Sequence, residues 1–126
     1  MKTIGLEIGN WIYDKDGRKV IVWGIDPSHD HIWVNHTGGS AVYKVKTKHI
    51  NPIPLIKQWL RDFEFEKSKQ PNGTVFWGRR SDPFRIFESF DNNYKLFGYE
   101  YTVIFRYVHQ LQNLYLPLTG KELIKT

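Results

Sequence analysis

Three lysines at alternate positions form the strongest functional feature of the chain. Lys44, Lys46 and Lys48 would share one face of an extended strand, because successive side chains of a strand point to opposite sides. Neighbouring lysines on that face would be about 6.6 Å apart, a spacing that resembles the phosphate repeat of a nucleic-acid strand. Lysine on an edge strand also prevents aggregation with other strands. The row therefore predicts either a phosphate-binding track or a solvated strand edge.

A second basic feature lies in the other half of the chain, where an aromatic residue precedes two arginines. Arg79 and Arg80 follow Trp77 across Gly78. An aromatic ring beside guanidinium groups is suited to stacking on a base while the cations hold phosphate. Trp33, close in sequence to the lysine row, is a second candidate for stacking. The alternative for Trp77 is a core residue at a strand end, with an exposed basic loop after it.

The last helical segment has a polar face that carries almost no charge. His109, Gln112 and Asn113 recur at helical spacing. The opposite stripe is apolar and contains Val108, Leu111 and Tyr115. Solvated helix faces usually carry Lys and Glu. The His–Gln–Asn face therefore indicates specific hydrogen bonds, either to the protein's own backbone or to a partner.

Metal binding and catalysis are both disfavoured by the motifs present. Four residues between 26 and 31 could in principle bind a metal, with His36 and His49 nearby: Asp26, His29, Asp30 and His31. Their spacing matches no metal signature, and an Asp-Pro-Ser-His-Asp turn accounts for them. His109 lacks a recognisable nucleophile or orienting group. No phosphate-binding loop, metalloprotease motif or nucleophile elbow occurs, so we predict a protein that is not an enzyme and uses no cofactor.

Composition favours a basic, soluble protein. The 126 residues carry a formal charge of +5 with a pI near 9.4, which favours an anionic partner. There is no cysteine, so neither disulfides nor thiolate chemistry is available. Aromatic residues make up 16% of the chain, more than a core of this size requires. No apolar run reaches the roughly 18 residues of a membrane span, and the N-terminus lacks the apolar region of a signal peptide.

Residues 1–50 are predicted to form a small SH3-like, partly open barrel. Val- and Ile-rich segments alternate with turn residues, and Asp16-Gly17 is a strong hairpin signal. Four short twisted strands with tight turns are typical of such a barrel. The expected strands are Leu6–Tyr13, Arg18–Ile25, Ile32–Val34 and Ala41–His49, with a turn at Thr37–Ser40.

Residues 51–126 are predicted to contain a short helix, a second antiparallel sheet and a C-terminal helix. The helix spans Leu55–Glu64, and Glu66–Gly73 is expected to be a polar loop. Pro117 should interrupt the terminal helix, and Thr119–Glu122 matches a capping box that would start a last turn. The expected strands are Thr74–Gly78, Phe84–Phe90, Tyr94–Phe97 and Tyr99–Tyr107, with a turn at Asp91–Asn93. The fold class is thus α+β and mostly β, in one compact domain over 1–126.

Three segments resemble a family of small proteins encoded by phages and prophages of gut anaerobes. The first is Gly-Asn-Trp-Ile-Tyr at Gly9–Tyr13, and the second is the Pro-Ile-Pro-Leu entry to a helix at Pro52–Leu60. The third and most specific is Tyr-Val-His-Gln-Leu-Gln-Asn-Leu-Tyr with Leu-Thr-Gly-x-Glu-Leu at Tyr107–Leu123. The resemblance implies a phage or mobile-element origin, and the lack of a signal-peptide pattern or apolar span predicts a cytoplasmic location in the host cell. It implies no particular activity.

Two functions from different classes follow from these features. The first is non-catalytic binding of an anionic partner, most simply nucleic acid. The second is an anti-defence role, in which the protein sequesters a nucleotide signal or blocks a host protein, and a homo-oligomer with a pocket at the subunit junction would favour sequestration. In the first, phosphates would contact Lys44, Lys46, Lys48, Arg79 and Arg80, and bases would stack on Trp33 and Trp77.

Overall fold

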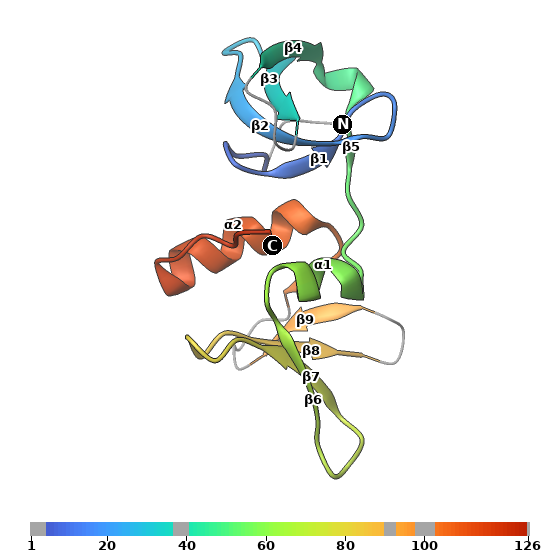
Figure 1. The fold of residues 1–126 in the computed structure, drawn as a ribbon, viewed down its shortest axis with the longest axis vertical. Helices are drawn as coiled ribbons and strands as arrows, with labels where there is room; N and C mark the ends of the chain where they lie inside the picture. Colours follow the sequence, from blue (N-terminus) through green and yellow to red (C-terminus); the bar gives the residue numbers. More distant parts are fainter. Residues whose placement is uncertain (1–4, 37–40, 90–92, 98–102, 126) are drawn as a thin grey trace. The chain divides into compact units, whose positions relative to one another are not determined.

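The computed structural model describes residues 5–36, 41–89, 93–97 and 103–125. The chain is arranged as two compact units. Unit 1 comprises residues 1–54 and 107–113, and unit 2 comprises residues 55–106 and 114–126. The predicted α+β class, mostly β, is confirmed, because each unit contains one antiparallel sheet of five strands (Figure 1). The predicted turn at Thr37–Ser40, most of the turn at Asp91–Asn93, and residues 99–102 of the last predicted strand lie outside the described residues.

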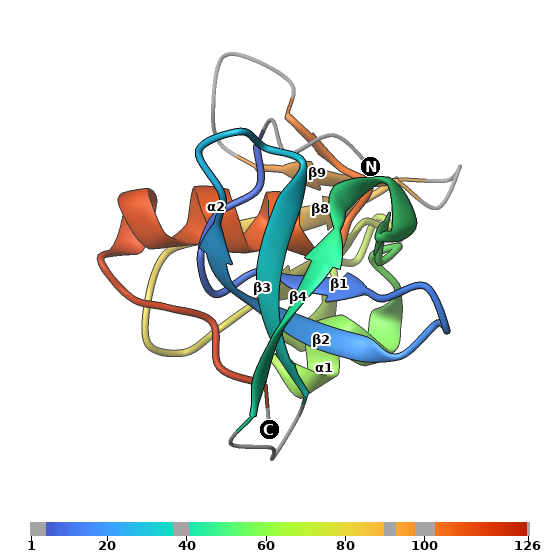
Figure 2. The ribbon, with the colours of Figure 1, turned by 90° about the horizontal axis from the view of Figure 1, so that it is seen from above.

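The sheet of unit 1 runs in the order β4-β3-β2-β1-β5, and Figure 2 shows its longer strands crossing in front of the viewer. All neighbouring strands are antiparallel. The sheet is open, because among the described residues no pairing joins β4 to β5 and closes an SH3-like barrel. The strands are β1 (Trp11–Tyr13), β2 (Lys19–Ile25), β3 (His31–His36), β4 (Val42–Lys46) and β5 (Asn51–Pro52), and a 3₁₀ turn, η1 (Thr47–His49), connects the last two.

The core of unit 1 follows from the two-residue alternation of its strands. One face of the sheet contributes Ile12, Val20 and Val34, each with no exposed surface. Partly buried Tyr43 and Val45 pack against this cluster from β4. Burial of these aliphatic side chains is the main stabilising contribution available to the sheet. The complete buried cluster is Leu6, Ile12, Val20, Val22, Ile32, Val34 and Ile50.

The sheet of unit 2 runs in the order β10-β9-β8-β7-β6 and is preceded by helix α1 (Lys57–Asp62). Its strands are β6 (Glu66–Lys69), β7 (Val75–Gly78), β8 (Arg85–Glu88), β9 (Tyr94–Leu96) and β10 (Ile104–Phe105). The prediction of a loop over Glu66–Gly73 was wrong for its first half. All four residues of β6 are exposed, so the strand has no apolar alternation to reveal it and is defined by backbone pairing with β7.

Aromatic rings dominate the core of unit 2. Phe84 has its ring centroid 5.0 Å from that of Tyr115 and 6.2 Å from that of Phe105. Phe65 meets Tyr115 edge-on, at 6.0 Å between centroids. Edge-to-face and tilted contacts of this kind stabilise a core beyond the area that they bury. The high aromatic content is therefore used largely inside the protein.

Helix α2 (Val108–Thr119) contributes its first half to unit 1 and its second half to unit 2. The prediction that Pro117 interrupts it was wrong, because the proline lies within the helix, two residues before its end. A proline there removes only one hydrogen bond of the last turn. The predicted new turn at Thr119–Glu122 is also absent. Gly120 instead ends the helix with φ 74°, and its N–H donates to the carbonyl of Leu116 at 2.7 Å.

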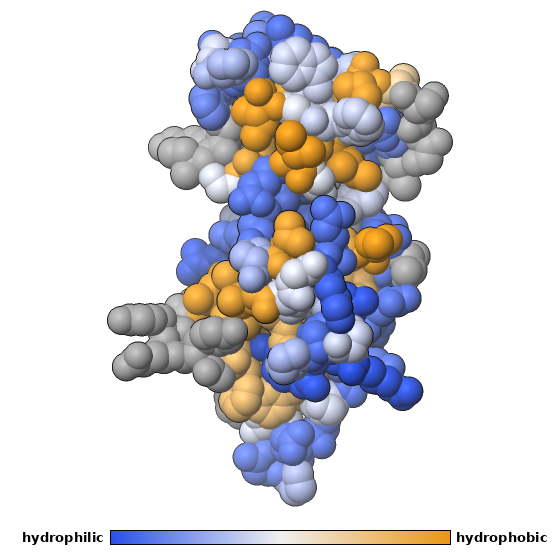
Figure 3. Space-filling model, turned by 90° about the vertical axis from the view of Figure 1, so that its left-hand side faces the viewer, coloured by the Kyte–Doolittle hydropathy of each residue, from blue (hydrophilic) through white to orange (hydrophobic). Residues whose placement is uncertain are grey.

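None of the helices within the described part of the chain has the length and apolar character needed to cross a membrane. Apolar residues nevertheless reach the surface of each unit, as the orange atoms in Figure 3 show. In unit 1 the exposed large apolar side chains are Ile8, Trp23 and Val42.

Candidate functional site

Two tryptophans lie on the outer face of the unit 1 sheet, beside a β-bulge in β2. Val22 and Ile25 both contact the core, although they are three residues apart, and the β2–β3 register shifts between them. Trp23 and Gly24 therefore both occupy outward positions opposite Trp33. A side chain on Gly24 would meet the Trp33 ring at 3.4 Å, so this ring lies against the glycine backbone. Trp23 is 58% exposed, which makes it an accessible aromatic surface.

Two lysines from β4 join these tryptophans on the same face. Lys44 pairs in register with Trp33, and its Nζ lies 5.3 Å from the centroid of that ring. Lys46 is exposed and pairs with His31, two residues along the same face. A cation over an indole ring is a favourable arrangement that also brings positive charge beside an aromatic surface. We call Trp23, Trp33, Lys44 and Lys46 the aromatic–lysine face.

Lys48 does not belong to this face, so the prediction of three lysines on one strand was wrong. β4 ends at Lys46, and Lys48 lies in the following 3₁₀ turn. The turn begins where Thr47 binds the preceding loop. Its N–H donates to the carbonyl of Asp30 at 2.9 Å, and its Oγ1 donates to the carbonyl of His29 at 3.0 Å. These bonds redirect the chain before the third lysine.

An acidic residue neutralises part of the face. Asp26 Oδ2 lies 3.7 Å from Lys44 Nζ. Hydrogen bonds from the backbone N–H and hydroxyl of Ser28, both 3.0 Å long, lower the pKa of Asp26, and the Lys44 ammonium lowers it further. The carboxylate therefore stays ionised near neutral pH, and a phosphate that approaches Lys44 must compete with it.

A pocket of about 240 Å³ adjoins the aromatic–lysine face and shares Lys44 and Lys46 with it. We call it the seam pocket, because it lies between the β1–β2 turn and the edge strand β4 of the open sheet. Its walls carry positively and negatively charged side chains and an aromatic hydroxyl. It is lined by Asp14, Lys15, Asp16, Arg18, Tyr43, Lys44, Val45, Lys46, His49 and Ile50.

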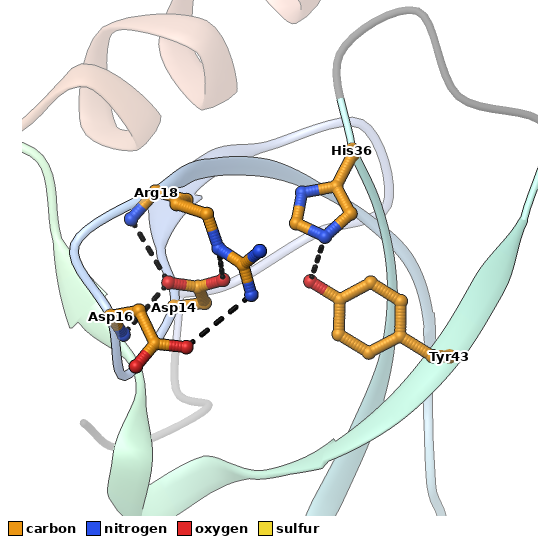
Figure 4. Close-up of polar contacts among 5 residues, drawn as sticks. All are labelled: Asp14, Asp16, Arg18, His36 and Tyr43. Atoms are coloured by element: carbon orange, nitrogen blue, oxygen red, sulfur yellow. Dashed lines mark hydrogen bonds and ion pairs between the residues drawn. The ribbon is translucent and has the colours of Figure 1, made fainter.

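Asp14 organises one wall of the seam pocket (Figure 4). Its Oδ1 accepts hydrogen bonds from the backbone N–H groups of Asp16 and Arg18, each at 2.9 Å. Its Oδ2 accepts a bond from Arg18 Nε at 3.0 Å, and Arg18 also bonds Asp16 at 3.3 Å. Burial alone would raise the pKa of Asp14, but the bonds from Arg18 and Asp16 outweigh this effect and lower it.

Tyr43 and His36 form the other polar pair in Figure 4. The Tyr43 hydroxyl lies 2.9 Å from His36 Nε2, and the two ring centroids are 5.0 Å apart. Burial raises the pKa of Tyr43, and the nearby charge of Asp14 raises it further. The hydroxyl therefore stays protonated at neutral pH. It can hydrogen-bond a ligand, but it is not activated as a phenolate nucleophile.

Replacing Asp14 with asparagine is expected to flatten the acid limb of the stability profile. A carboxylate whose pKa is lowered by folding stabilises the protein above its unfolded pKa, about 3.9, and this contribution is lost as pH falls through the folded pKa. Asparagine keeps the Oδ1 acceptor but does not titrate. Urea denaturation between about pH 2 and pH 7 measures the difference, with Asp16→Asn as the exposed control. Parallel profiles for wild type and Asp14→Asn would contradict the assignment.

The predicted base-stacking role of Trp77 is wrong, because this residue is a core residue. Its side chain is 1% exposed, and its Nε1 has no hydrogen-bond partner among the described residues. The Arg61 guanidinium covers the ring at 5.8 Å from its centroid. Trp77 is the buried residue of β7, and its neighbours on the strand are only partly buried. Its side chain therefore points to the inner face of the sheet. The structural alternative for this residue is therefore the correct one.

The two predicted arginines have different environments. Arg79 is held in place, because its Nη1 donates to the Tyr115 hydroxyl at 2.9 Å and its Nη2 lies 3.6 Å from a Glu64 oxygen. The side chain of Arg80 is 89% exposed and makes an ion pair with Glu66 at 3.4 Å. Arg80 is therefore the more accessible cation of the two.

Two residues of the polar face of α2, Gln112 and Asn113, hydrogen-bond to the segment before β1 within unit 1. Gln112 accepts from the N–H of Trp11 at 2.9 Å and donates to the carbonyl of Gly9 at 3.1 Å. Asn113 accepts from Asn10 Nδ2 at 2.7 Å. These bonds confirm the structural alternative for Gln112 and Asn113, since they tie the irregular segment before β1 to the helix. The partners of Gln112 and Asn113 lie about a hundred residues away in the sequence, so no local pattern reveals them.

His109 lies on the same helix but is packed rather than poised for proton transfer. It is buried, and its Nδ1 has no hydrogen-bond partner among the described residues. Its ring stacks on that of Tyr107, with centroids 5.9 Å apart and planes 10° apart. Burial lowers the pKa of His109, so the neutral imidazole is favoured at pH 7.

The histidines and carboxylates of the loop after β2 serve turn chemistry. Asp26 caps the turn through Ser28, and His29 adopts the left-handed conformation with φ 63°. Across the part of the chain that the structure describes, no three His, Cys, Asp or Glu side chains gather in a group that could hold a metal.

Sequence reasoning missed Trp23, Tyr43 and the seam pocket. The signal for Trp23 was the Val-Trp-Gly-Ile stretch, in which a glycine interrupts a strand and the apolar alternation changes phase. No local pattern marks the seam pocket, because its walls come from separate turns and strands. Its residues meet only when the sheet curls.

Comparisons with known proteins identify no relative of this chain. No family model matches the chain, and searches of curated proteins and of solved structures also find no match. Function is therefore inferred from the residues and their geometry.

Proposed function

We propose that unit 1 is a non-catalytic binding module for single-stranded nucleic acid, with the aromatic–lysine face as its contact surface. The observation that carries this proposal is the position of Lys44 over Trp33, beside exposed Trp23 and Lys46. A base would stack on the exposed Trp23 ring, and the ammonium groups would contact phosphates. We also propose the finer assignment of unit 1 as an SH3-like small barrel, and a phage origin for the chain.

Several physical arguments favour a single strand over a duplex. Stacking on an indole requires bases that are not already paired, and each base stacked on an aromatic side chain contributes about 1–3 kcal/mol. The two lysines provide positive charge on the same face, at the spacing of alternate strand positions. The seam pocket begins at these lysines and has room for a neighbouring phosphate or sugar, with Tyr43 in its wall.

Removing both lysines should reduce the salt dependence of oligonucleotide binding. Each phosphate contact to a single strand contributes about 0.7 to the slope of log K against log salt, so Lys44→Ala with Lys46→Ala should lower it by about 1.4. Filter binding to a mixed-sequence oligonucleotide over a salt series measures this slope. The matched control is Lys48→Ala with Lys69→Ala, which removes the same charge from exposed positions outside the face. Equal slopes for the two double variants would contradict the proposal.

Trp23→Ala provides the complementary arm of the same experiment. Loss of one stacked base should weaken binding about 5- to 150-fold without changing the salt slope, because no charge is removed. Binding no better than about millimolar at low salt would overturn the nucleic-acid proposal. The anti-defence hypothesis would then lead. A panel of cyclic and linear nucleotides, tested by calorimetry, would separate nucleotide sequestration from inhibition of a host protein.

A further inference from the structure

Unit 2 carries a second concentration of positive charge that the proposed nucleic-acid face does not use. Two adjoining hollows, of about 520 and 180 Å³, share Glu66, Arg79 and Arg80 in their walls. We call them together the arginine groove. Its cationic residues are Arg61, Lys67, Arg79, Arg80 and Arg85. The groove is thus built by the end of α1, the strands β6 to β8 and the loop between β7 and β8.

Positive charge exceeds negative charge in the groove. Five cationic side chains line it, whereas Glu64 and Glu66 are the only carboxylates among its described lining residues. Each carboxylate makes one ion pair, Glu64 with Arg79 and Glu66 with Arg80. The remaining charge raises the local concentration of anions. Four of the cations are arginines, whose planar forks match the geometry of phosphate oxygens.

Two of the arginines are held in position before any ligand binds. Arg79 is fixed by the Tyr115 hydroxyl and by Glu64, as described above. Arg85 Nη1 donates to the carbonyls of Asp82 at 2.8 Å and Phe84 at 3.0 Å. Among the described residues no acceptor is found for its Nε and Nη2. A guanidinium anchored through one nitrogen can present the others to a ligand with little loss of conformational entropy.

Gly78 makes room for this arrangement. It pairs in register with Arg85, and a Cβ at Gly78 would lie 2.6 Å from Arg85 Cδ and 2.8 Å from Nε. Contacts this short do not occur between real side chains, so any larger residue would displace the arginine. The absence of a side chain therefore lets Arg85 extend across β7, where Gly78 and Arg85 line the smaller hollow together.

We infer that the arginine groove binds the phosphate chain of a small polyphosphate ligand. The cations extend along both hollows, so a ligand with two or three phosphates can contact more of them than a single phosphate can. Among its described lining residues the groove offers no open aromatic surface for a base, because Phe65 in its wall and Trp77 beneath Arg61 are both buried. The ligand is therefore recognised through its phosphates rather than through a nucleobase.

Calorimetry with tripolyphosphate, ATP, GTP and orthophosphate tests this inference on the full chain. Tripolyphosphate should bind with a stoichiometry of one, ATP and GTP should bind about equally, and orthophosphate should bind more weakly. Arg80→Ala should weaken tripolyphosphate binding about tenfold, because one charge-assisted contact is lost. Arg80 is highly exposed, so this variant should fold normally. Gly78→Ala should weaken binding as well, through displacement of Arg85.

Controls separate this site from the aromatic–lysine face. Lys69→Ala and Lys48→Ala lie outside both the groove and the aromatic–lysine face and should leave tripolyphosphate binding unchanged. Absence of tripolyphosphate binding, or binding that Arg80→Ala and Gly78→Ala leave intact, would overturn the inference. A strong preference between ATP and GTP would also overturn it. If Arg80→Ala weakens oligonucleotide binding as much as tripolyphosphate binding, the groove serves a nucleic-acid backbone and the small-ligand inference fails.

Discussion

Leu111→Ala is expected to lower the free energy of unfolding by about 2–5 kcal/mol. Leu111 lies on the apolar stripe of α2 and has no exposed surface. Truncation removes buried methyl groups and leaves a cavity that the surrounding side chains fill only in part. Urea denaturation followed by circular dichroism measures the loss.

The same helix supplies a matched control for this substitution. Leu116 also lies on α2, but its side chain is 40% exposed. Leu116→Ala therefore removes the same atoms from a site that is only partly buried. Its cost should be clearly smaller than that of Leu111→Ala. Leu111→Met should cost less than about 1.5 kcal/mol, since it nearly conserves volume. A loss below about 0.5 kcal/mol for Leu111→Ala would show that the helix contributes little to stability.

Trp77→Ala is expected to cost about 3–5 kcal/mol, because it removes the largest fully buried side chain of unit 2. Trp77→Phe should cost much less. Phenylalanine retains an aromatic ring, and it removes the buried Nε1–H that lacks a hydrogen-bond partner among the described residues. Chemical denaturation of the two variants measures both costs under identical conditions.

Oligonucleotide binding distinguishes Trp77 from Trp23. Under conditions in which the variant remains folded, Trp77→Phe should bind like the wild type, whereas Trp23→Ala should bind more weakly. The reason is exposure, since Trp23 is accessible and Trp77 is enclosed. Unchanged stability of Trp77→Ala together with loss of oligonucleotide binding would restore the stacking role predicted from sequence.

Local patterns predicted most of the secondary structure and part of the candidate site. The apolar alternation of β2 and β3 and the Asp16-Gly17 turn placed these two strands within about two residues, whereas β1 begins only at Trp11 and β5 was not predicted. The helical spacing of Val108, Leu111 and Tyr115 correctly indicated their burial. Lys44 and Lys46 do share a strand face, as their i, i+2 spacing requires.

Errors arose where a local pattern was compatible with more than one environment. Exposed β6 carried no apolar alternation, so only pairing with β7 revealed it. Lys48 continued the lysine spacing, but Thr47 bonded the preceding loop and ended the strand. Pro117 was predicted to break the helix because proline disfavours helix interiors. This effect is small at Pro117, which lies in the last turn of α2.

The sequence by itself determined the fold class, the basic character of the chain and the positions of most core residues, because these depend on composition and on contacts between near neighbours. Tertiary structure alone decided which tryptophan is accessible and which cations converge. The bulge in β2 placed Gly24 rather than a side chain against the Trp33 ring, and the partners of Gln112 and Asn113 lie about a hundred residues away. The arginine groove likewise requires α1 and three strands to meet. Long-range packing, which no window of sequence contains, sets these distances.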